Sequence, residues 1–215
     1  RAAARVGVEI ITQAQVPKID VGAEGFVVTT DKGRFESARL LNCAGAWGRQ
    51  IASDFGEPVP LSMYGPQMGV TEPLPYKIKP VIGTWSDGPG AYLRQVERGN
   101  VVFGGGVKRT PVDAASGYAK VDPALLGRQL ENVVQLVPAL RNVTVIRQWS
   151  GCEGYVADDL PVMGPSSTTP GLFHAFGFCG HGFQLGPGVG DAMAELIATG
   201  HCETPLAPFH ISRFQ

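Results

Sequence analysis

The chain has 215 residues, 44% of them hydrophobic, and carries 18 basic against 19 acidic residues, which gives a net charge of −1. This is enough sequence for one sizeable hydrophobic core, or for two smaller ones that share the chain. The balanced charge argues against a nucleic-acid partner and against a polybasic contact with a membrane. No apolar run reaches the ~18 residues that a membrane helix needs, so we expect no membrane span.

The cysteines give no sign of a metal site. Cys43, Cys152, Cys179 and Cys202 form no CxxC pair and no zinc-type spacing with a histidine. Three of them lie in apolar, strand-like contexts, which is typical of buried reduced thiols. We therefore expect no bound metal and a reducing, cytoplasmic location. His174, His201 and His210 stand in no pattern that indicates a role.

The first part of the chain reads as the continuation of a longer protein. It begins at Arg1 without an initiator methionine, at what reads as a helix end running into a strand, so we expect an N-terminal segment to be missing. Residues 8–16 read as a strand, and residues 25–30 and 34–43 as a hairpin around Asp31-Lys32-Gly33. Residues 46–55 predict a short helix that Gly56 ends.

From residue 58 to about 106 the pattern changes to short strands separated by Pro, Gly and Asn turns. Strands are predicted at residues 63–71, 79–85, 91–95 and 101–104, with a hairpin turn at residues 97–100. This pattern predicts an antiparallel sheet inserted between two pieces of a different domain.

Two helices are predicted after this sheet. Asp122 is the expected N-cap of the first and Pro123 its first residue, and apolar residues then recur at helical spacing up to Pro138. Strands follow at residues 143–149 and 172–178. The second helix is expected over residues 182–199, ended by Gly200.

The junction before this second helix is the most informative segment. Seven of the fourteen residues from 177 to 190 are glycine or proline, although apolar residues such as Leu185, Val189 and Met193 share one helical face. Glycine disfavours a helix interior by ~1 kcal/mol relative to alanine. So many glycines indicate that something flat or anionic approaches the backbone closely.

A strand–loop–helix junction presents unpaired N–H groups and the positive end of the helix dipole, which can bind a phosphate or stabilise an oxyanion. The alternative is close packing of helix on sheet, where the glycines merely permit contact. No GxGxxG follows the first strand and no GxxxxGK[ST] occurs, so neither a complete Rossmann nor a Walker phosphate site is predicted.

Four segments carry a resemblance to a known family. Residues 177–184, Gly-Phe-Cys-Gly-His-Gly-Phe-Gln, resemble the C-terminal flavin motif of the D-amino-acid oxidase, sarcosine oxidase and glycine oxidase superfamily of FAD-dependent oxidoreductases. Residues 41–47 resemble its turn beside the cofactor, and residues 149–151 with 158–164 its return from the substrate domain. Residues 7–10 with Val16 resemble the strand that contacts adenine. Within the superfamily, the chain looks most like β subunits of heteromeric sarcosine oxidases.

The resemblance implies an α/β (α+β) fold. Residues 1–57 and 149–215 would form an FAD-binding domain that lacks its N-terminal βαβ unit. Residues 58–148 would form an inserted antiparallel substrate-binding domain. Because the missing unit holds the diphosphate, this chain alone is expected to bind FAD poorly and to be inactive.

The resemblance also assigns cofactor residues. Noncovalent FAD would be bound by Val16, Ala44, Gly45, Trp47, Gly177, Gly180, His181, Gly182, Phe183 and Gln184. N–H groups at the helix start would stabilise negative charge on the flavin's N1–C2=O2 edge. Gln184 and His181 are the candidate catalytic residues, with packing near the flavin as the alternative role of His181. Covalent relatives attach flavin at the position of Gly151, one residue from Cys152.

Met68, Tyr92, Glu153 and Tyr155 are the predicted substrate pocket. Glu153 stands where glycine-oxidase-like relatives have an arginine that pairs with the substrate carboxylate, so it favours an ammonium group instead. Arg94, Arg109 and Arg147 are the alternative carboxylate partners. The oxygen-activating lysine of monomeric sarcosine oxidases is absent near Val102, which favours a dehydrogenase that passes electrons to a partner.

The predicted function is FAD-dependent oxidation of an amine or N-substituted amino acid, sarcosine- or opine-like, by hydride transfer to the flavin. The partners would be a small amine substrate and a further subunit or electron acceptor. One alternative is a 2-hydroxy-acid or glycerol-phosphate dehydrogenase on the same scaffold, which would need a cation where Glu153 stands. Another is a non-catalytic subunit or fragment.

Overall fold

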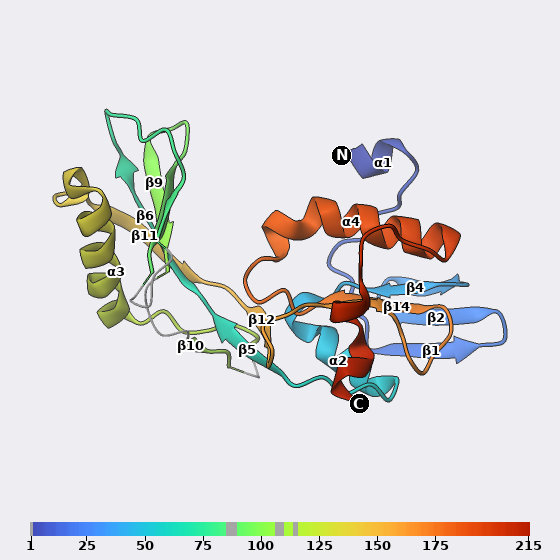
Figure 1. Cartoon of the computed structure of the whole chain (residues 1–215). Helices are drawn as coiled ribbons and strands as arrows, with labels where there is room; N and C mark the ends of the chain where they lie inside the picture. Colours follow the sequence, from blue (N-terminus) through green and yellow to red (C-terminus); the bar gives the residue numbers. More distant parts are fainter. Residues whose placement is uncertain (1, 85–89, 106–109, 114–115) are drawn as a thin grey trace.

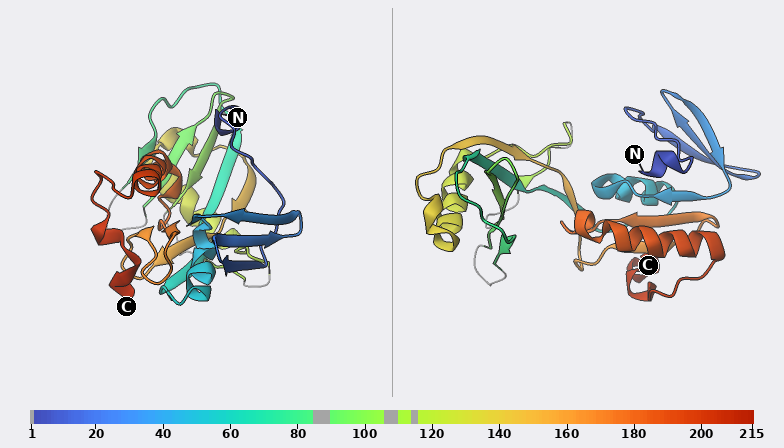
Figure 2. Two further views of the ribbon diagram at one scale, coloured as in Figure 1. Left: turned by 90° about the vertical axis from the view of Figure 1, so that its right-hand side faces the viewer. Right: turned by 90° about the horizontal axis from the view of Figure 1, so that it is seen from above.

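The computed structural model describes residues 2–84, 90–105, 110–113 and 116–215. Figure 1 shows two packed bodies, and the view from above in Figure 2 shows that extended strands connect them. Within these ranges, no helix has both the length and the apolar character that a membrane crossing needs. The domain boundaries at residues 57 and 148 stay predictions.

The first body is an antiparallel sheet covered by one helix. Its strands, in the spatial order β11-β6-β9-β8-β7, are β11 (Val145–Ser150), β6 (Gln67–Pro73), β9 (Asn100–Gly104), β8 (Tyr92–Gln95) and β7 (Ile82–Gly83). The helix α3 (Pro123–Leu136) contributes Val133 to a core that contains Leu93, Val101 and Phe103 of the sheet. Burial of these side chains is what holds the helix on the sheet.

α3 begins where the sequence predicts it. The Asp122 carboxylate accepts a hydrogen bond from the Ala124 N–H at 2.9 Å, and Pro123 occupies the first helical position, where a missing N–H costs nothing. The helix ends at Leu136, and the short 3-10 helix η2 (Pro138–Leu140) follows it.

The second body has a mixed sheet between two helices. β14 (Leu172–Phe176) lies between β13 (Val162–Pro165), which is antiparallel to it, and β4 (Leu40–Asn42), which is parallel to it. Neighbouring strand residues point to opposite faces. Phe176 packs with Ala52 of α2 (Gly48–Asp54), while Ala175 packs with Met193 of α4 (Gly182–Thr199).

A three-stranded antiparallel meander stands at the edge of the second body. It consists of β1 (Lys18–Gly22), β2 (Gly25–Thr30) and β3 (Gly33–Ser37). Phe26 is buried and meets the ring of Phe55 edge-on, with ring centroids 6.1 Å apart. This contact ties the meander to the end of α2.

A fourth sheet, which has three strands, lies between the two bodies. Its order is β10 (Thr110–Pro111), β5 (Leu61–Gly65) and β12 (Glu153–Val156), and all pairs are antiparallel. Glu153 pairs with Tyr64, and Val156 pairs with Leu61 in the buried core of the second body. β12 therefore has one end near the first body and the other end in the second.

The terminal segments are short helices and turns. They are α1 (Ala2–Arg5), η3 (Ala207–Phe209) and η4 (Ile211–Phe214). Arg213 holds the C-terminal tail in place through a 2.7 Å ion pair with Asp158 and through hydrogen bonds to the carbonyl oxygens of Phe209 and Leu160.

Several predicted elements are confirmed. The β2–β3 hairpin, the β8–β9 hairpin, α2, α3, β11 and α4 all form, and α4 has the predicted bounds. Gly99 adopts a φ of 95° in the second hairpin, and Gly200 ends α4 with a φ of 81°. Only glycine adopts these conformations without strain.

Other predictions were wrong. Residues 8–16 form no strand, and Val8 and Ile10 are 50% and 60% exposed, because no neighbouring strand pairs with them in the described chain. The run 34–43 divides into β3 and β4, which belong to different sheets. The run 63–71 divides at Pro66, which has no N–H for a continuous ladder. The predicted strand 79–85 shortens to β7, and Trp85 lies outside the described residues.

Candidate active site

β12 brings two segments together that are far apart in the sequence. A Cβ added to Gly154 would lie 3.0 Å from the Ala46 Cα, so this strand runs directly against the 3-10 helix η1 (Gly45–Trp47). On its other side, the Cys179 N–H donates to the Gly154 carbonyl at 3.1 Å. The predicted turn at residues 44–47 and the predicted flavin motif therefore meet at one place.

The loop that precedes α4 has an unusual backbone. Gly177, Cys179 and Gly180 have φ values of 70°, 51° and 87°, in the left-handed region. A Cβ on Gly177 would lie 2.6 Å from Val156 Cγ2, so only glycine fits there. Cys179 is not a glycine, and its buried thiol accepts a hydrogen bond from the Val156 N–H at 3.4 Å. Such strain persists where surrounding contacts hold it, and it is common at functional sites.

The N-terminus of α4 has the features of a helix end that stabilises an anion. No side chain among the described residues caps it, and its first turn contains no acidic residue. Phe183 and Gln184 are exposed, and His181 stands at the N-cap position. The first N–H groups of a helix have no partner within the helix, and the dipole makes this end positive. The helix start can therefore stabilise negative charge on a ligand.

A groove of about 640 Å³ runs between α4 and the edge strand β4. Gly182, Gly186 and Gly190 line it at four-residue spacing, on one helix face, so the helix backbone itself forms one wall. Leu41 and Gly45 line the opposite wall. The groove is mostly apolar and connects the α4 start with the turn at residues 44–47, which suits a flat ligand or a closely packed element.

The turn at residues 44–47 contributes the Gly45 backbone to this groove and leaves its Trp47 ring exposed. Gly45 adopts a φ of 56°, and no atom of the described residues lies within 4 Å of a Cβ built on it. Trp47 is 53% exposed, although tryptophan is usually well covered. Both features leave room for a ligand beside the turn.

An acidic and aromatic cluster lies next to the α4 loop. The Tyr155 hydroxyl donates to Glu153 Oε2 at 2.5 Å, and the Tyr155 ring meets Tyr64 edge-on with centroids 5.8 Å apart. A Cβ on Gly180 would lie 3.3 Å from both Glu153 Oε2 and the Tyr155 oxygen. The carboxylate is thus a direct neighbour of the predicted flavin loop.

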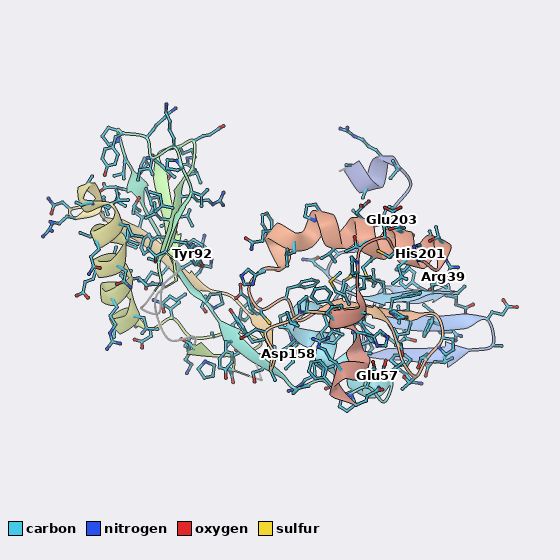
Figure 3. All side chains as sticks on the ribbon, in the orientation of Figure 1. Arg39, Glu57, Tyr92, Asp158, His201 and Glu203 are labelled. Atoms are coloured by element: carbon cyan, nitrogen blue, oxygen red, sulfur yellow. The ribbon has the colours of Figure 1, made fainter. Side chains whose placement is uncertain are left out.

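Tyr92 and Met68 extend this cluster into the first body. The Tyr92 hydroxyl lies 2.9 Å from Met68 Sδ, to which it donates. Burial raises the pKa of Tyr92, and the negative charge of Glu153 raises it further, so the two groups are within electrostatic range. Figure 3 shows Tyr92 on the part of the five-stranded sheet that faces the second body. We call Met68, Tyr92, Glu153 and Tyr155 the acidic cluster.

The other predicted residues lie in different surroundings. Val16 is 46% exposed in the segment that precedes β1. Arg94 lies on β8 with its side chain exposed, and the Arg147 guanidinium lies 5.9 Å from the Trp149 ring centroid. Arg109 lies outside the described residues. Among the described residues, neither Arg94 nor Arg147 forms an ion pair with Glu153.

Sequence reasoning missed two features of this region. Tyr64 of β5 completes the aromatic side of the acidic cluster, and no local signal in the sequence pointed to it. A buried network of Asn42, Glu57 and His174 lies behind the turn at residues 44–47. Asn42 falls within a motif that carries the family resemblance, but its side chain could not be assigned from the sequence.

Comparisons with known proteins identify the family of the chain. The profile of the family "DAO: FAD dependent oxidoreductase" matches residues 1–196. The chain is 32% identical over 197 residues to FAD-dependent oxidoreductase domain-containing protein 1 of Bos taurus, covering 83% of this chain and 40% of that protein. It is 30% identical over 215 residues to the sarcosine oxidase subunit beta of Rhizobium meliloti (strain 1021), covering 97% of this chain and 49% of that protein.

The fold has a close match among solved structures. L-proline dehydrogenase from P. horikoshii superimposes with a TM-score of 0.89 at 26% sequence identity, over 99% of this chain and 56% of that one. The chain therefore spans about half the length of the proteins that it resembles.

Proposed function

Because the chain belongs to the DAO family of FAD-dependent oxidoreductases, we propose that it forms part of an enzyme that oxidises an amine or an N-substituted amino acid. The observation that supports an amine substrate is the acidic cluster, where the Glu153 carboxylate lies beside the loop that leads into α4. The chain spans about half of its relatives, so this activity is proposed for the protein that contains it.

The residues present fit FAD. Gly45 and Gly182 line the same groove, and a Cβ on Gly45 would point into open space, so a planar ring system has access to the backbone there. Burial raises the pKa of the Cys152 thiol, and the charge of Glu153 raises it further. A thiol kept protonated is a poor nucleophile. This supports a noncovalent cofactor held by residues 44–47 and 177–184.

Bound FAD would supply the acceptor for a hydride taken from the carbon beside the amine nitrogen. The N–H groups of Gly182, Phe183 and Gln184 would then face the negative charge that develops, where preorganised donors are most effective. On the substrate, the bound ammonium group first gives up a proton to water, which frees the nitrogen lone pair. The C–H bond then breaks as the hydride leaves, the lone pair forms a C=N bond, and added water releases an amine together with an aldehyde or oxo acid. The chain's own part is to bind, orient and stabilise.

Glu153 favours an amine over a hydroxy acid. Its carboxylate attracts a protonated amine, and the rings of Tyr64 and Tyr155 lie beside it, where an aromatic face attracts a cation. A substrate carboxylate at the same point would be repelled by the like charge. An N-substituted amino acid would therefore bind with its nitrogen toward Glu153 and its carboxylate elsewhere.

The proposal is tested on the protein from its source, with whatever residues flank this chain. Glu153→Gln keeps the size of the side chain and removes its charge. A charge-assisted contact contributes ~1.5–3 kcal/mol, so we expect KM for amines to rise about 10- to 100-fold with a smaller change in kcat. Glu131→Gln, at an exposed position of α3, is the matched control and should leave KM unchanged.

An unchanged KM in Glu153→Gln would contradict the assigned role of Glu153. Faster oxidation of a hydroxy acid or glycerol phosphate than of any amine would contradict the proposed substrate class.

A further inference from the structure

A buried polar network lies behind the candidate flavin turn and takes no part in the chemistry proposed above. Asn42 of β4, Glu57 after α2 and His174 of β14 are 3%, 1% and 0% exposed. Burying polar and ionisable groups costs free energy unless each is hydrogen-bonded. The network must therefore satisfy each of its members, and this requirement fixes the direction of every bond in it.

The backbone determines how the Asn42 amide is oriented. Asn42 Oδ1 lies 3.2 Å from the Ala44 nitrogen, and Asn42 Nδ2 lies 2.9 Å from the Gly48 oxygen. A backbone N–H can only donate and a carbonyl can only accept, so Oδ1 must face Ala44 and Nδ2 must face Gly48. One side chain thus spans the turn at residues 44–47 from its entrance to its exit.

The same orientation determines the state of His174. Asn42 Nδ2 has a second hydrogen, which points to His174 Nδ1 at 3.3 Å. Nδ1 must therefore accept, which leaves the ring proton on Nε2. Nε2 lies 3.1 Å from Glu57 Oε2 and donates to it. The geometry requires a neutral His174 between an amide donor and a carboxylate acceptor.

Glu57 is anchored on its other side. Ser166 Oγ donates to Oε2 at 2.5 Å, and the Ser167 N–H and Oγ donate to Oε1 at 2.6 and 2.7 Å. Burial pushes the pKa of Glu57 up, but the bonds from Ser166, Ser167 and His174 outweigh it and leave that pKa below its usual value. The carboxylate therefore stays ionised, and Figure 3 shows Glu57 in the second body.

We propose that Asn42 is a positioning residue for the turn at residues 44–47, held in its working orientation by neutral His174 and Glu57, and that protonation of His174 releases it. The link to catalysis rests on the proposed function, because it takes this turn as the wall of the flavin site. The positioning itself depends only on the contacts described.

The release follows from donor and acceptor counting. A proton added to His174 Nδ1 turns an acceptor into a donor that faces the donor Asn42 Nδ2. Turning the amide over would relieve this contact, but Oδ1 would then face the Gly48 carbonyl and Nδ2 would face the Ala44 N–H. In either orientation of the amide, the turn loses its hydrogen bond to Asn42 at one end or at both.

The groups around His174 act in opposite directions. Burial lowers its pKa, the hydrogen bond and negative charge of Glu57 raise it, and the charge of His210 lowers it. The Phe176 ring meets the imidazole edge-on, with centroids 5.6 Å apart, and adds no charge. The net direction is downward, so His174 is neutral at neutral pH and takes a proton only on acidification below the usual histidine value.

The test is nuclear magnetic resonance on the 15N-labelled protein. We expect His174 Nδ1 to resonate as an unprotonated ring nitrogen and Nε2 as a protonated one at pH 7. Exchange of the Ala44 amide, corrected for its intrinsic pH dependence, should then accelerate with the same midpoint as the His174 titration. The proposal would be overturned if Nδ1 carried a proton at pH 7. It would also be overturned if the corrected exchange rate of the Ala44 amide did not change as His174 titrates.

Two variants separate positioning from general stability. His174→Gln keeps a donor toward Glu57 and lacks the Nδ1 acceptor, so Ala44 should exchange about five- to tenfold faster at neutral pH and lose its pH step. His201→Asn removes an exposed histidine as the control and should change neither. Global unfolding by urea is measured alongside. Equal acceleration of all amides in His174→Gln would indicate mere destabilisation and contradict the proposal.

The resonance experiment can succeed or fail independently of the test of the proposed function. The resonance experiment needs no flavin, so a protein that fails to oxidise amines can still show the His174 and Ala44 behaviour. If His174 and Ala44 fail to behave as proposed while amine oxidation is intact, only the positioning role is lost.

Discussion

Replacing Gly177 by alanine tests whether the loop before α4 is built as described. The substitution places a Cβ 2.6 Å from Val156 Cγ2, in a residue with a φ of 70°. The left-handed conformation costs ~1–2 kcal/mol for a non-glycine residue, and overpacking a core contact costs a further ~1–3 kcal/mol. We therefore expect a loss of about 2–5 kcal/mol in the free energy of unfolding.

Two other glycines separate the cost of the left-handed conformation from the cost of the close contact. Gly200 also has a positive φ, 81°, but no described atom lies within 4 Å of its Cβ, so Gly200→Ala should cost only the ~1–2 kcal/mol of conformational strain. Gly188 is inside α4 in open space, so Gly188→Ala should stabilise by up to ~1 kcal/mol.

Urea unfolding followed by circular dichroism measures all three variants. The expected order of stability is Gly188→Ala, wild type, Gly200→Ala and then Gly177→Ala. The loss in Gly177→Ala corresponds to a fall in Tm of about 4–20 °C, at ~2–4 °C per kcal/mol for a chain of this size. If Gly177→Ala were no less stable than Gly200→Ala, the close contact with Val156 would not exist.

Three further predictions concern stability and the pKa of Asp158. Asp122→Ala removes the N-cap of α3 and should cost ~0.5–2 kcal/mol in urea unfolding, while Asp122→Asn should cost little. Arg213→Ala removes the clamp on the tail and the hydrogen bond that lowers the pKa of Asp158. The Asp158 pKa, followed by carboxyl resonances, should return upward in that variant, and no change would contradict the ion pair. The folded-state pKa values of His174 and Glu57 are both lowered, so their contribution to stability is complete above the unfolded values and is lost on acidification. Tm should fall first as the pH drops below ~6.5 and again below ~4.3, and His174→Gln should lack the first step.

Local signals in the sequence were enough to predict much of the fold. The Asp122–Pro123 cap, the turn at Gly99 and the glycine that ends α4 each act within a few residues, so α3, the β8–β9 hairpin and α4 formed as predicted. Strands that depend on distant partners were harder. β12 is four residues long and pairs with β5 about 90 positions earlier, so its pattern could not be recognised.

The candidate site also contains parts that local signals predicted and parts that depend on residues distant in the sequence. The glycine-rich junction and the turn at residues 44–47 were found because their residue types are unusual within a short window. The buried network was not, because Asn42 and Glu57 are 132 and 117 positions from His174. Glu57 and His174 look like ordinary surface residues until the fold buries them.

Anaerobic reduction of the bound flavin is the most direct measurement of the proposed function. The protein from its source, with whatever residues flank this chain, is mixed with an N-methyl amino acid, an opine, a 2-hydroxy acid and glycerol phosphate in turn. The account predicts that the flavin absorbance bleaches with one of the amines, and that Glu153→Gln slows bleaching at low amine concentration. A protein that binds no flavin, or whose flavin only a hydroxy compound reduces, would contradict it.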